Sequence, residues 1–555
     1  MSRKVTYILF ALLIHFAAAS SAKAGYRIPD DLSIGSNIAY VTVVEATLGS
    51  SSSVLATEPV SENLKRGAVF LCENFDDPRC QDKHTMSGTI VLSPCSITST
   101  TACIESLSVG SSETSLVGTK LRFEGLGHKV PESKIAGVPA GGSPSVWSTD
   151  GLDNFVVLAE IVYIRGKADS VAHIHQFTVN AFPVTLIEDS KYQAPRFSQI
   201  LDGDRTTVSL LNTGTQDDEC FLVTDGLCYL RDEFKENTRV KLELRVPHNV
   251  TGWLFGRMRS PSIQVRPIND KSNLLTVEAT SVQVPNLIGT LTKSEVRSNP
   301  GILAWTRTLP MASTDSLLDN LLKSPGSVGQ INRGNDQLQL ISWWGQLLKS
   351  YGGTDKKFAV SSRWMFGSSP SGQNSNPCFA DKSRLIGLVT TNAPIYESGP
   401  PKMVDGALNY LVGGPHHLGD GKSLFRGVYD LAIRSETARC IYKFSDAPIR
   451  AEISVTSADG TVQEYATESI TERDGWIRLG AYNFTFSTPT VKVRLLQDTS
   501  TQQSQGNTSA PSKSSADLNP TAKGSKLVKC VNSKTGKTKL VTRSMKCPRG
   551  FVNNR

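Results

Sequence analysis

The stretch RAEISVTSADGTVQEYATESI, residues 450–470, decides the fold class. Polar and apolar residues alternate on both sides of its centre, as they do along a β-strand with one buried face. Asp459-Gly460 lies between the two alternating runs, and this dipeptide in such a setting is a strong signal for a tight hairpin turn. The stretch therefore predicts two antiparallel strands joined by a short turn.

Comparable runs, rich in Val, Ile, Leu and aromatic residues, occur along most of the chain between clusters of Gly, Ser, Asn and Asp. They predict strands at Ile38–Ala46, Leu116–Phe123, Phe155–Ile164, Val240–Val246, Leu274–Val284, Phe358–Met365, Trp476–Phe486 and Thr490–Leu496. The run at Phe155–Ile164 is almost wholly apolar, which indicates a buried strand. The pattern predicts a mainly all-β fold of several β-sandwiches, Ig-like or related.

Two segments have helical spacing instead. Residues 313–325 place four leucines on one face of a short helix that begins near Ser313 and ends at a proline. Residues 340–351 repeat apolar residues at the same spacing and include Trp343 and Trp344. We interpret this tryptophan pair as core packing, with a sugar-stacking platform as the alternative.

The chain has 555 residues, which is enough for three or four folded units. Residues 498–525 contain almost no apolar side chains, which predicts a flexible linker. The division we expect is 1–24 signal peptide, 25–190 β domain, 191–300 β domain, 301–497 β-sandwich domain with short helices, 498–525 linker, and 526–555 basic disulfide hairpin module.

The first 24 residues have the features of a secretory signal peptide. Arg3 and Lys4 form a positive start, Tyr7–Ala19 is an apolar run, and Ala22-Lys23-Ala24 supplies the small residues of a cleavage site. The apolar run is shorter than the roughly 18 residues a membrane-spanning helix needs. We therefore expect a secreted, extracellular or envelope-associated protein with no transmembrane segment.

Ten cysteines support export to an oxidising compartment. Spacing suggests the pairs Cys72 with Cys80, Cys95 with Cys103, Cys220 with Cys228, Cys378 with Cys440, and Cys530 with Cys547. Crossed pairing among the first four cysteines is the main alternative, because spacing alone does not prove connectivity. No closely spaced cysteine pair adjoins histidines, so the cysteines do not predict a zinc site.

Few residues point to catalysis or metal binding. The chain lacks the G-x-S-x-G turn of many hydrolases, a complete P-loop and an EF-hand loop. His173 and His175 lie two residues apart on a predicted strand, so both side chains lie on one face and could bind a metal. The simpler interpretation is that this face of the strand is exposed to solvent. Several acidic loops could supply carboxylate oxygens to calcium: Asp76-Asp77, Asp202 with Asp204, and Asp217-Asp218-Glu219. We expect no other cofactor.

The net charge of +8 is unevenly distributed. The signal segment carries +3, residues 25–517 carry −5, and residues 518–555 carry +10. The terminal module contains nine basic residues, and we name eight of them the basic set: Lys526, Lys529, Lys534, Lys537, Lys539, Arg543, Lys546 and Arg549. This module is suited to an anionic wall polymer, glycan or lipid headgroup. It has no base-reading helix or aromatic platform, so we expect no nucleic-acid partner.

Several longer segments carry a resemblance. CFADKSRLIGLVTTNAPIYESGPP from Cys378, LFRGVYDLAIRSETARCIYKFSDAPIRAEISV from Leu424, GWIRLGAYNFTFSTPTVKVRL from Gly475 and VTGWLFGRMRSPSIQV from Val250 resemble uncharacterised secreted proteins of actinobacteria. KCVNSKTGKTKLVTRSMKCPRGF from Lys529 is similar to a small module at the end of exported actinobacterial proteins. The resemblance implies a secreted or cell-surface location, and it implies no activity and no functional residues.

These features predict a binding, adhesion or scaffold protein of the cell envelope in preference to an enzyme. One alternative is an extracellular carbohydrate-active hydrolase whose two carboxyl groups come from separate strands. Another is a structural protein that associates with itself in a surface layer. A protein partner or self-association is compatible with both the first and the last interpretation.

Overall fold

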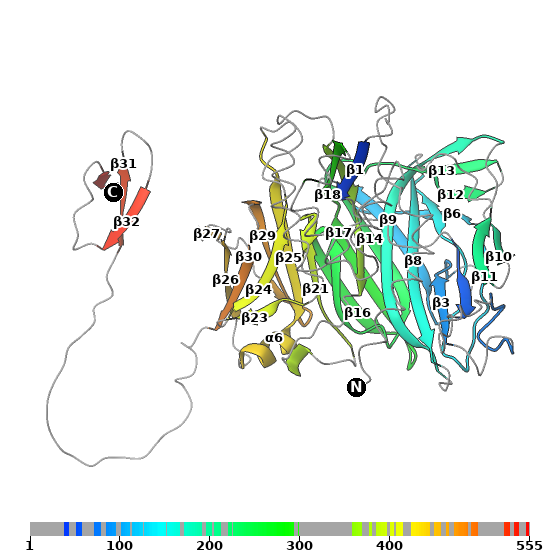
Figure 1. The fold of residues 1–555 in the computed structure, drawn as a ribbon. Helices are drawn as coiled ribbons and strands as arrows, with labels where there is room; N and C mark the ends of the chain where they lie inside the picture. Colours follow the sequence, from blue (N-terminus) through cyan, green and yellow to red (C-terminus); the bar gives the residue numbers. More distant parts are fainter. Residues whose placement is uncertain are drawn as a thin grey trace, which may run out of the picture. The chain divides into compact units, whose positions relative to one another are not determined.

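The computed structural model divides the chain into two compact units, Met1–Thr499 and Ser500–Arg555, which we name the β unit and the C-terminal unit. The structure describes residues 38–43, 52–57, 71–78, 85–95, 101–111, 114–125, 127–150, 153–166, 171–190, 196–202, 205–211, 220–224, 226–292, 298, 358–368, 377–379, 384–396, 400–404, 407–414, 423–443, 449–456, 462–465, 471–486, 490–497, 527–532, 538–542 and 551–553. These residues are mostly β-strand, as the sequence predicts (Figure 1).

A sheet of 14 strands, which we name the large sheet, runs through the β unit. Its main path is β2 (Val54–Thr57), β3 (Met86–Val91), β8 (Asn154–Arg165), β9 (His173–Glu188), β20 (Met365–Ser368), β15 (Gly252–Arg257), β21 (Leu385–Thr391), β25 (Arg426–Arg434), β29 (Trp476–Thr485) and β28 (Thr471–Arg473). Beside this path lie β6 (Lys120–Glu124), β7 (Ser145–Ser148), β12 (Cys220–Thr224) and β13 (Leu227–Arg231). The three segments expected as β domains, 25–190, 191–300 and 301–497, all contribute strands to this one hydrogen-bonded sheet.

A five-stranded sheet shares its core with the large sheet. Its order is β16 (Arg259–Pro267), β17 (Ser272–Thr280), β14 (Thr238–Pro247), β4 (Cys103–Ser111) and β5 (Val117–Gly118). Along β14 buried and partly exposed residues alternate, because successive side chains of a strand point to opposite faces. The buried residues Val240, Leu242 and Leu244 belong to one apolar cluster with Val157 and Phe177 of the large sheet.

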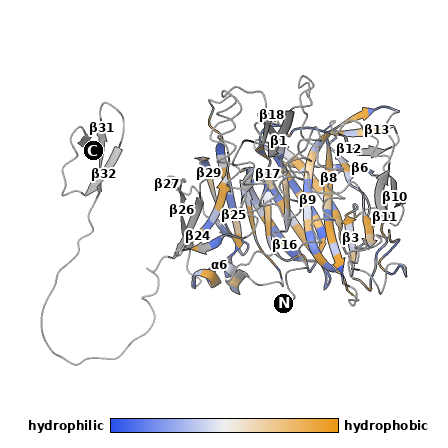
Figure 2. Cartoon of the chain, in the orientation of Figure 1, coloured by the Kyte–Doolittle hydropathy of each residue, from blue (hydrophilic) through white to orange (hydrophobic). Residues whose placement is uncertain are grey.

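The buried strand expected at Phe155–Ile164 is confirmed as β8, and even its acid Glu160 is only 6% exposed. Figure 2 shows hydrophobic residues following β8 and its neighbour β9. Burial of such apolar area provides most of the favourable free energy of folding. These two strands therefore form the centre of the first core.

A six-stranded sheet packs near the other end of the large sheet. It contains β22 (Ile395–Tyr396), β23 (Lys402–Val404), β24 (Ala407–Gly413), β30 (Thr490–Gln497), β26 (Ile449–Thr456) and β27 (Val462–Tyr465). The pairing of β26 with β27 confirms the hairpin predicted from residues 450–470, with Thr456 opposite Val462. Side chains of β24 and β25 meet in a second apolar cluster, where the rings of Tyr410 and Tyr429 lie 5.4 Å apart.

Three strands expected to be continuous are each divided between sheets. Leu116–Phe123 becomes β5 of the five-stranded sheet and β6 of the large sheet, which separate at Thr119. Leu274–Val284 becomes β17 and β18 (Val282–Thr292), which separate at Ser281, and Phe358–Met365 becomes β19 (Phe358–Arg363) and β20, which separate at Trp364. β18 is the central strand of a three-stranded sheet and pairs with β1 (Ile38–Val43) on one side and with β19 on the other. The Trp364 indole donates a hydrogen bond to the Ala279 carbonyl at 3.2 Å, so the points at Ser281 and Trp364 where the chain passes between sheets lie close together.

The described helix α6 covers Ser435–Tyr442 and follows β25 directly. It ends at Lys443, whose φ of 55° is left-handed, a common way for a helix to stop. A disulfide joins Cys440 of this helix to Cys378 in the short 3₁₀-helix η2 (Pro377–Phe379). The helices predicted at 313–325 and 340–351 lie outside the described residues.

The C-terminal unit contains three described strands. β31 (Leu527–Asn532) pairs antiparallel with both β32 (Thr538–Thr542) and β33 (Phe551–Asn553). Figure 1 draws these strands at the red end of the colour scale. Cys547, the expected disulfide partner of Cys530, lies outside the described residues, so the disulfide of this module stays a prediction.

Candidate functional site

The candidate site is built around Asp430, a charged residue inside the apolar strand β25. Because side chains alternate along a strand, Tyr429 and Leu431 point into the second apolar cluster, whereas Asp430 and Ala432 point the opposite way. Ala432 belongs to the cluster shared with the five-stranded sheet. Asp430 is therefore directed at the edge of the five-stranded sheet, where it is only 4% exposed.

Both carboxyl oxygens of Asp430 accept hydrogen bonds from other elements. The backbone N–H of Ser260, in the edge strand β16, donates to Oδ2 at 3.0 Å. The hydroxyl of Tyr482, in β29, donates to Oδ1. The Ser260 Oγ lies 3.1 Å from the Tyr482 hydroxyl, and either oxygen can be the donor. We name Asp430, Tyr482 and Ser260 the acid cluster.

Two arginines extend the acid cluster along the same junction. The guanidinium of Arg259 lies over the Tyr482 ring, 4.6 Å from its centroid, in a cation–π contact. The Nη2 of Arg478, also on β29, donates a hydrogen bond to the carbonyl of Ile263 at 3.3 Å. Side chains of the large sheet thus bind a backbone N–H and a backbone carbonyl of β16. These are groups that an edge strand would otherwise leave without a ladder partner.

A glycine makes room for the bond between Tyr482 and Asp430. Gly480 lies directly opposite Asp430 in the β25–β29 ladder. A Cβ at this position would come 2.4 Å from the Tyr482 hydroxyl and 2.7 Å from the Asp430 Oδ1. Any larger residue would therefore displace the hydroxyl from the carboxyl group.

Burial dominates the electrostatics of the acid cluster. It raises the pKa of Asp430 from 3.8 to about 7, because a charged carboxylate loses its hydration there. The hydrogen bonds from Tyr482 and Ser260 and the charge of Arg259 oppose this rise and do not cancel it. Burial also raises the pKa of the Tyr482 hydroxyl, and the neighbouring Asp430 raises that pKa further. Asp430 therefore titrates near neutral pH.

The geometry of the acid cluster accommodates either protonation state of Asp430. When the carboxyl group is ionised, Ser260 Oγ–H donates to the Tyr482 oxygen and Tyr482 O–H donates to Asp430. When Asp430 is protonated, both hydroxyls can reverse, so that Asp430 donates to Tyr482 and Tyr482 donates to Ser260. The chain of hydroxyls connects a buried acid to Ser260, which is exposed.

The histidines singled out in the sequence lie on β9, far along the sheet order from Asp430. His173 and His175 are both exposed, and desolvation lowers the pKa of His175. Among the described residues, one group of three side chains has ligand atoms within 4.8 Å of one another, and it contains neither histidine. The described residues therefore do not complete a metal site around this pair.

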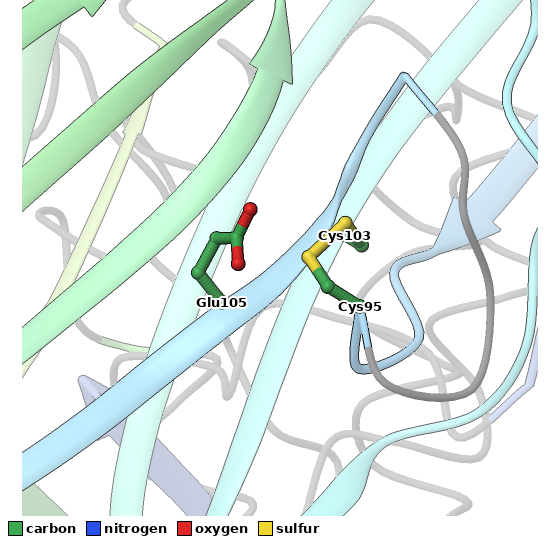
Figure 3. Close-up of side chains that lie close together, drawn as sticks. All are labelled: Cys95, Cys103 and Glu105. Atoms are coloured by element: carbon green, nitrogen blue, oxygen red, sulfur yellow. A yellow bond between two sulfur atoms is a disulfide. The ribbon is translucent and has the colours of Figure 1, made fainter. Parts of the chain in front are cut away.

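That group is Cys95, Cys103 and Glu105, which Figure 3 draws together. The two sulfur atoms are bonded to each other in a disulfide, so they offer no thiolate to a metal. Glu105 forms an ion pair with Arg245 of β14. The arrangement is a structural crosslink at the start of β4.

The other expected site residues are placed only in part. Cys72 and Cys228 are disulfide-bonded, while Cys80 and the side chain of Cys220 lie outside the description. Asp77 accepts a hydrogen bond from the Glu73 N–H at 3.0 Å, which is a local turn contact. In the basic set, Lys529 lies opposite Leu540 and Lys539 opposite Cys530 in the β31–β32 ladder. The other six residues of the basic set lie outside the described residues, as do Asp204 and residues 217–219. The backbone of Asp202 is described, but its side chain is not.

Sequence reasoning missed the acid cluster because its members are far apart along the chain. The available signal was Asp430 itself, the one charged residue within GVYDLAI at 427–433. Neither Ser260 nor Tyr482 is distinctive without the fold. A comparison with protein-family models found no match, and a comparison with curated proteins found none either.

Proposed function

We propose that the protein is a secreted binding, adhesion or scaffold protein of the cell envelope, held to anionic wall polymers by its C-terminal unit. One observation carries this proposal: the positive charge is concentrated in a separate compact unit. Residues 500–555 carry a net charge of +10, whereas residues 25–499 carry −5. A small cationic unit in the same chain as a larger, mildly acidic one is suited to electrostatic attachment.

The features that support export are the signal-peptide pattern at residues 1–24, the disulfides and the resemblance to secreted actinobacterial proteins. Disulfides persist in oxidising compartments. Every described cysteine whose side chain is placed is bonded, and no free cysteine occurs among them. No described helix combines the length and apolar character needed to cross a membrane.

We also infer that the β unit contains β-sandwiches related to the Ig-like type. The support is that inner-face residues of the five-stranded sheet and the large sheet belong to one apolar cluster. Two sheets that bury facing apolar residues are the basis of sandwich architecture. For the C-terminal unit we propose a hairpin closed by Cys530 and Cys547.

Asp430 does not favour the hydrolase alternative. A glycosidase needs two carboxyl groups that face one substrate. Asp430 is the described acid whose pKa burial raises, yet both of its oxygens bind protein groups and it is 4% exposed. This arrangement supports a structural role for Asp430 and leaves the binding function as our proposal.

The proposal is tested by binding of the full chain to isolated cell walls that contain phosphate-rich polymers, with walls stripped of those polymers as the reference. We expect binding to the first and little to the second, and a steep loss with added salt, since ions screen such contacts. In the test variant, Lys534, Lys537 and Lys546 are replaced by Gln. Affinity should fall roughly a hundredfold at low salt, since each base near an anionic surface contributes about 1 kcal/mol.

The matched control replaces three exposed lysines of the β unit by Gln: Lys120, Lys129 and Lys235, whose side chains are 81%, 63% and 81% exposed. This control should bind as the unchanged protein does. Equal losses in the two triple variants, or equal binding to intact and stripped walls, would refute attachment through the C-terminal unit.

A further inference from the structure

The edge strand β16 of the five-stranded sheet is secured by side chains of the large sheet. Among the described strands β16 pairs with β17 alone, on one side, and its register shifts between Arg259 and Ser262. On the open side, Asp430 accepts the Ser260 N–H, and Arg478 donates to the Ile263 carbonyl. Two sheets that share a core are thus also connected by directional bonds at this edge.

We propose that the acid cluster of Asp430, Tyr482 and Ser260 is a proton-operated latch, which holds β16 on the large sheet most firmly when Asp430 is protonated. Burial and connectivity carry the proposal. The carboxyl group is 4% exposed, and each of its oxygens is bonded to a different strand, β16 or β29. An acid in this position couples its ionisation to the contact between the strands.

The backbone conformation of Ser260 favours the release of β16 from the large sheet. Its φ of 52° is left-handed, which is unfavourable for a residue with a side chain, and Pro261 follows it directly. The hydrogen bonds to Asp430 and Tyr482 hold it in this conformation. When those bonds break, the backbone at Ser260 can relax to an extended conformation, which favours the open form of the latch.

The charged and titratable groups that face Asp430 oppose the effect of its burial and do not cancel it. Arg259 of β16 and Tyr482 of β29 face it, and Tyr429 precedes it on its own strand. Arg259 is the cation that attracts the carboxylate, but this residue is exposed, so solvent screens its charge. Arg478, two residues before Gly480 on β29, is bound to Ile263.

Thermodynamic linkage between protonation and opening gives the direction in which pH shifts the latch. Asp430 has a pKa of about 7 in the closed latch and the ordinary value of 3.8 once solvent reaches it. Between these values the closed form binds a proton that the open form releases to water. Rising pH therefore favours opening, by up to about tenfold in the equilibrium constant per pH unit, and the effect levels off above pH 7.

The test is hydrogen exchange of the full chain, which reports the opening of individual amides after correction for the intrinsic effect of pH. The amides of Ser260, Ser262 and Ile263 should lose up to about a hundredfold of their protection between pH 5 and pH 7. Asp430→Asn should remove this pH dependence. The control Asp150→Asn, at a side chain that is 76% exposed, should keep it.

A second variant separates the latch from a merely structural contact. Tyr482→Phe keeps the ring beneath Arg259 and removes the hydroxyl, whose hydrogen bond lowers the pKa of Asp430. The variant should move the midpoint of the exchange profile to higher pH. The proposal is overturned if the amides of β16 in the unchanged protein and in Asp430→Asn respond equally to pH, or if Tyr482→Phe leaves the midpoint where it was.

Discussion

The two faces of β25 are held by different forces. On one face Tyr429, Leu431 and Ile433 pack in an apolar cluster with residues of β24. On the other face Asp430 is bound by Ser260 and Tyr482 at the edge of a second sheet. Apolar burial is non-directional and does not depend on pH, whereas the acid cluster depends on both geometry and protonation. One strand therefore joins a pH-independent contact to a pH-dependent contact.

The largest effect is expected on the apolar face. Ile433→Ala removes most of a fully buried side chain and leaves a cavity, at a cost of about 2–5 kcal/mol in the free energy of unfolding. Chemical denaturation of the full chain at pH 5 and pH 8 should give the same loss at both values. A loss that differs strongly between the two pH values would contradict the assigned difference between the faces.

Asp430→Asn should change the pH dependence of stability. Since the folded-state pKa is about 7 and the ordinary value is 3.8, the folded protein holds the proton longer as pH rises. The free energy of unfolding of the unchanged protein, relative to the variant, should fall by up to about 1.4 kcal/mol per pH unit in this window and stay level above it. Denaturation curves at several pH values measure the difference, and parallel profiles would rule out titration of Asp430.

Gly480→Ala tests the close approach of Tyr482 to Asp430. The added methyl group would overlap the Tyr482 hydroxyl and Asp430 Oδ1, so we expect a loss of about 1–3 kcal/mol from overpacking. Gly118→Ala is the matched control, because a Cβ at Gly118 meets no atom within 4 Å. If the two alanine variants are equally stable, the space at Gly480 is not a constraint.

The smallest effects come from a pair of tyrosines on the two faces. The Tyr429 hydroxyl is buried without a hydrogen-bond partner in the described part of the chain, so Tyr429→Phe should be neutral or more stable by about 1 kcal/mol. Tyr482→Phe loses a bond to Asp430 and should be less stable by a similar amount. Thermal unfolding compares the two variants. Shifts of the same sign would show that the faces do not differ in this respect.

Local patterns were enough to predict the fold class and some of the strands. The β26–β27 hairpin and the buried strand β8 follow from alternation and from a continuous apolar run. The disulfides Cys95–Cys103 and Cys378–Cys440 match the expected pairs, the first because its cysteines are close in sequence. Such features depend on residues near one another in the chain.

Features that depend on distant residues were not predictable. The crossings at Ser281 and Trp364 turn continuous apolar runs into strands of different sheets, and nothing in the local pattern marks them. The acid cluster unites Ser260, Asp430 and Tyr482, which only the pairing of β25 with β29 and the position of β16 bring together. A lone acid in an apolar strand indicates a buried polar contact, but it does not identify the partner.

The most direct test of the account is the titration of Asp430 in the full chain, followed by its side-chain carboxyl signal in carbon-13 NMR. Asp430→Asn identifies the signal by its disappearance. Because burial outweighs the hydrogen bonds and the nearby arginine, we expect a midpoint at a pKa of about 7. A midpoint near the ordinary value of 3.8 would contradict it, because the carboxyl group would then be ionised throughout the range in which the latch is proposed to respond.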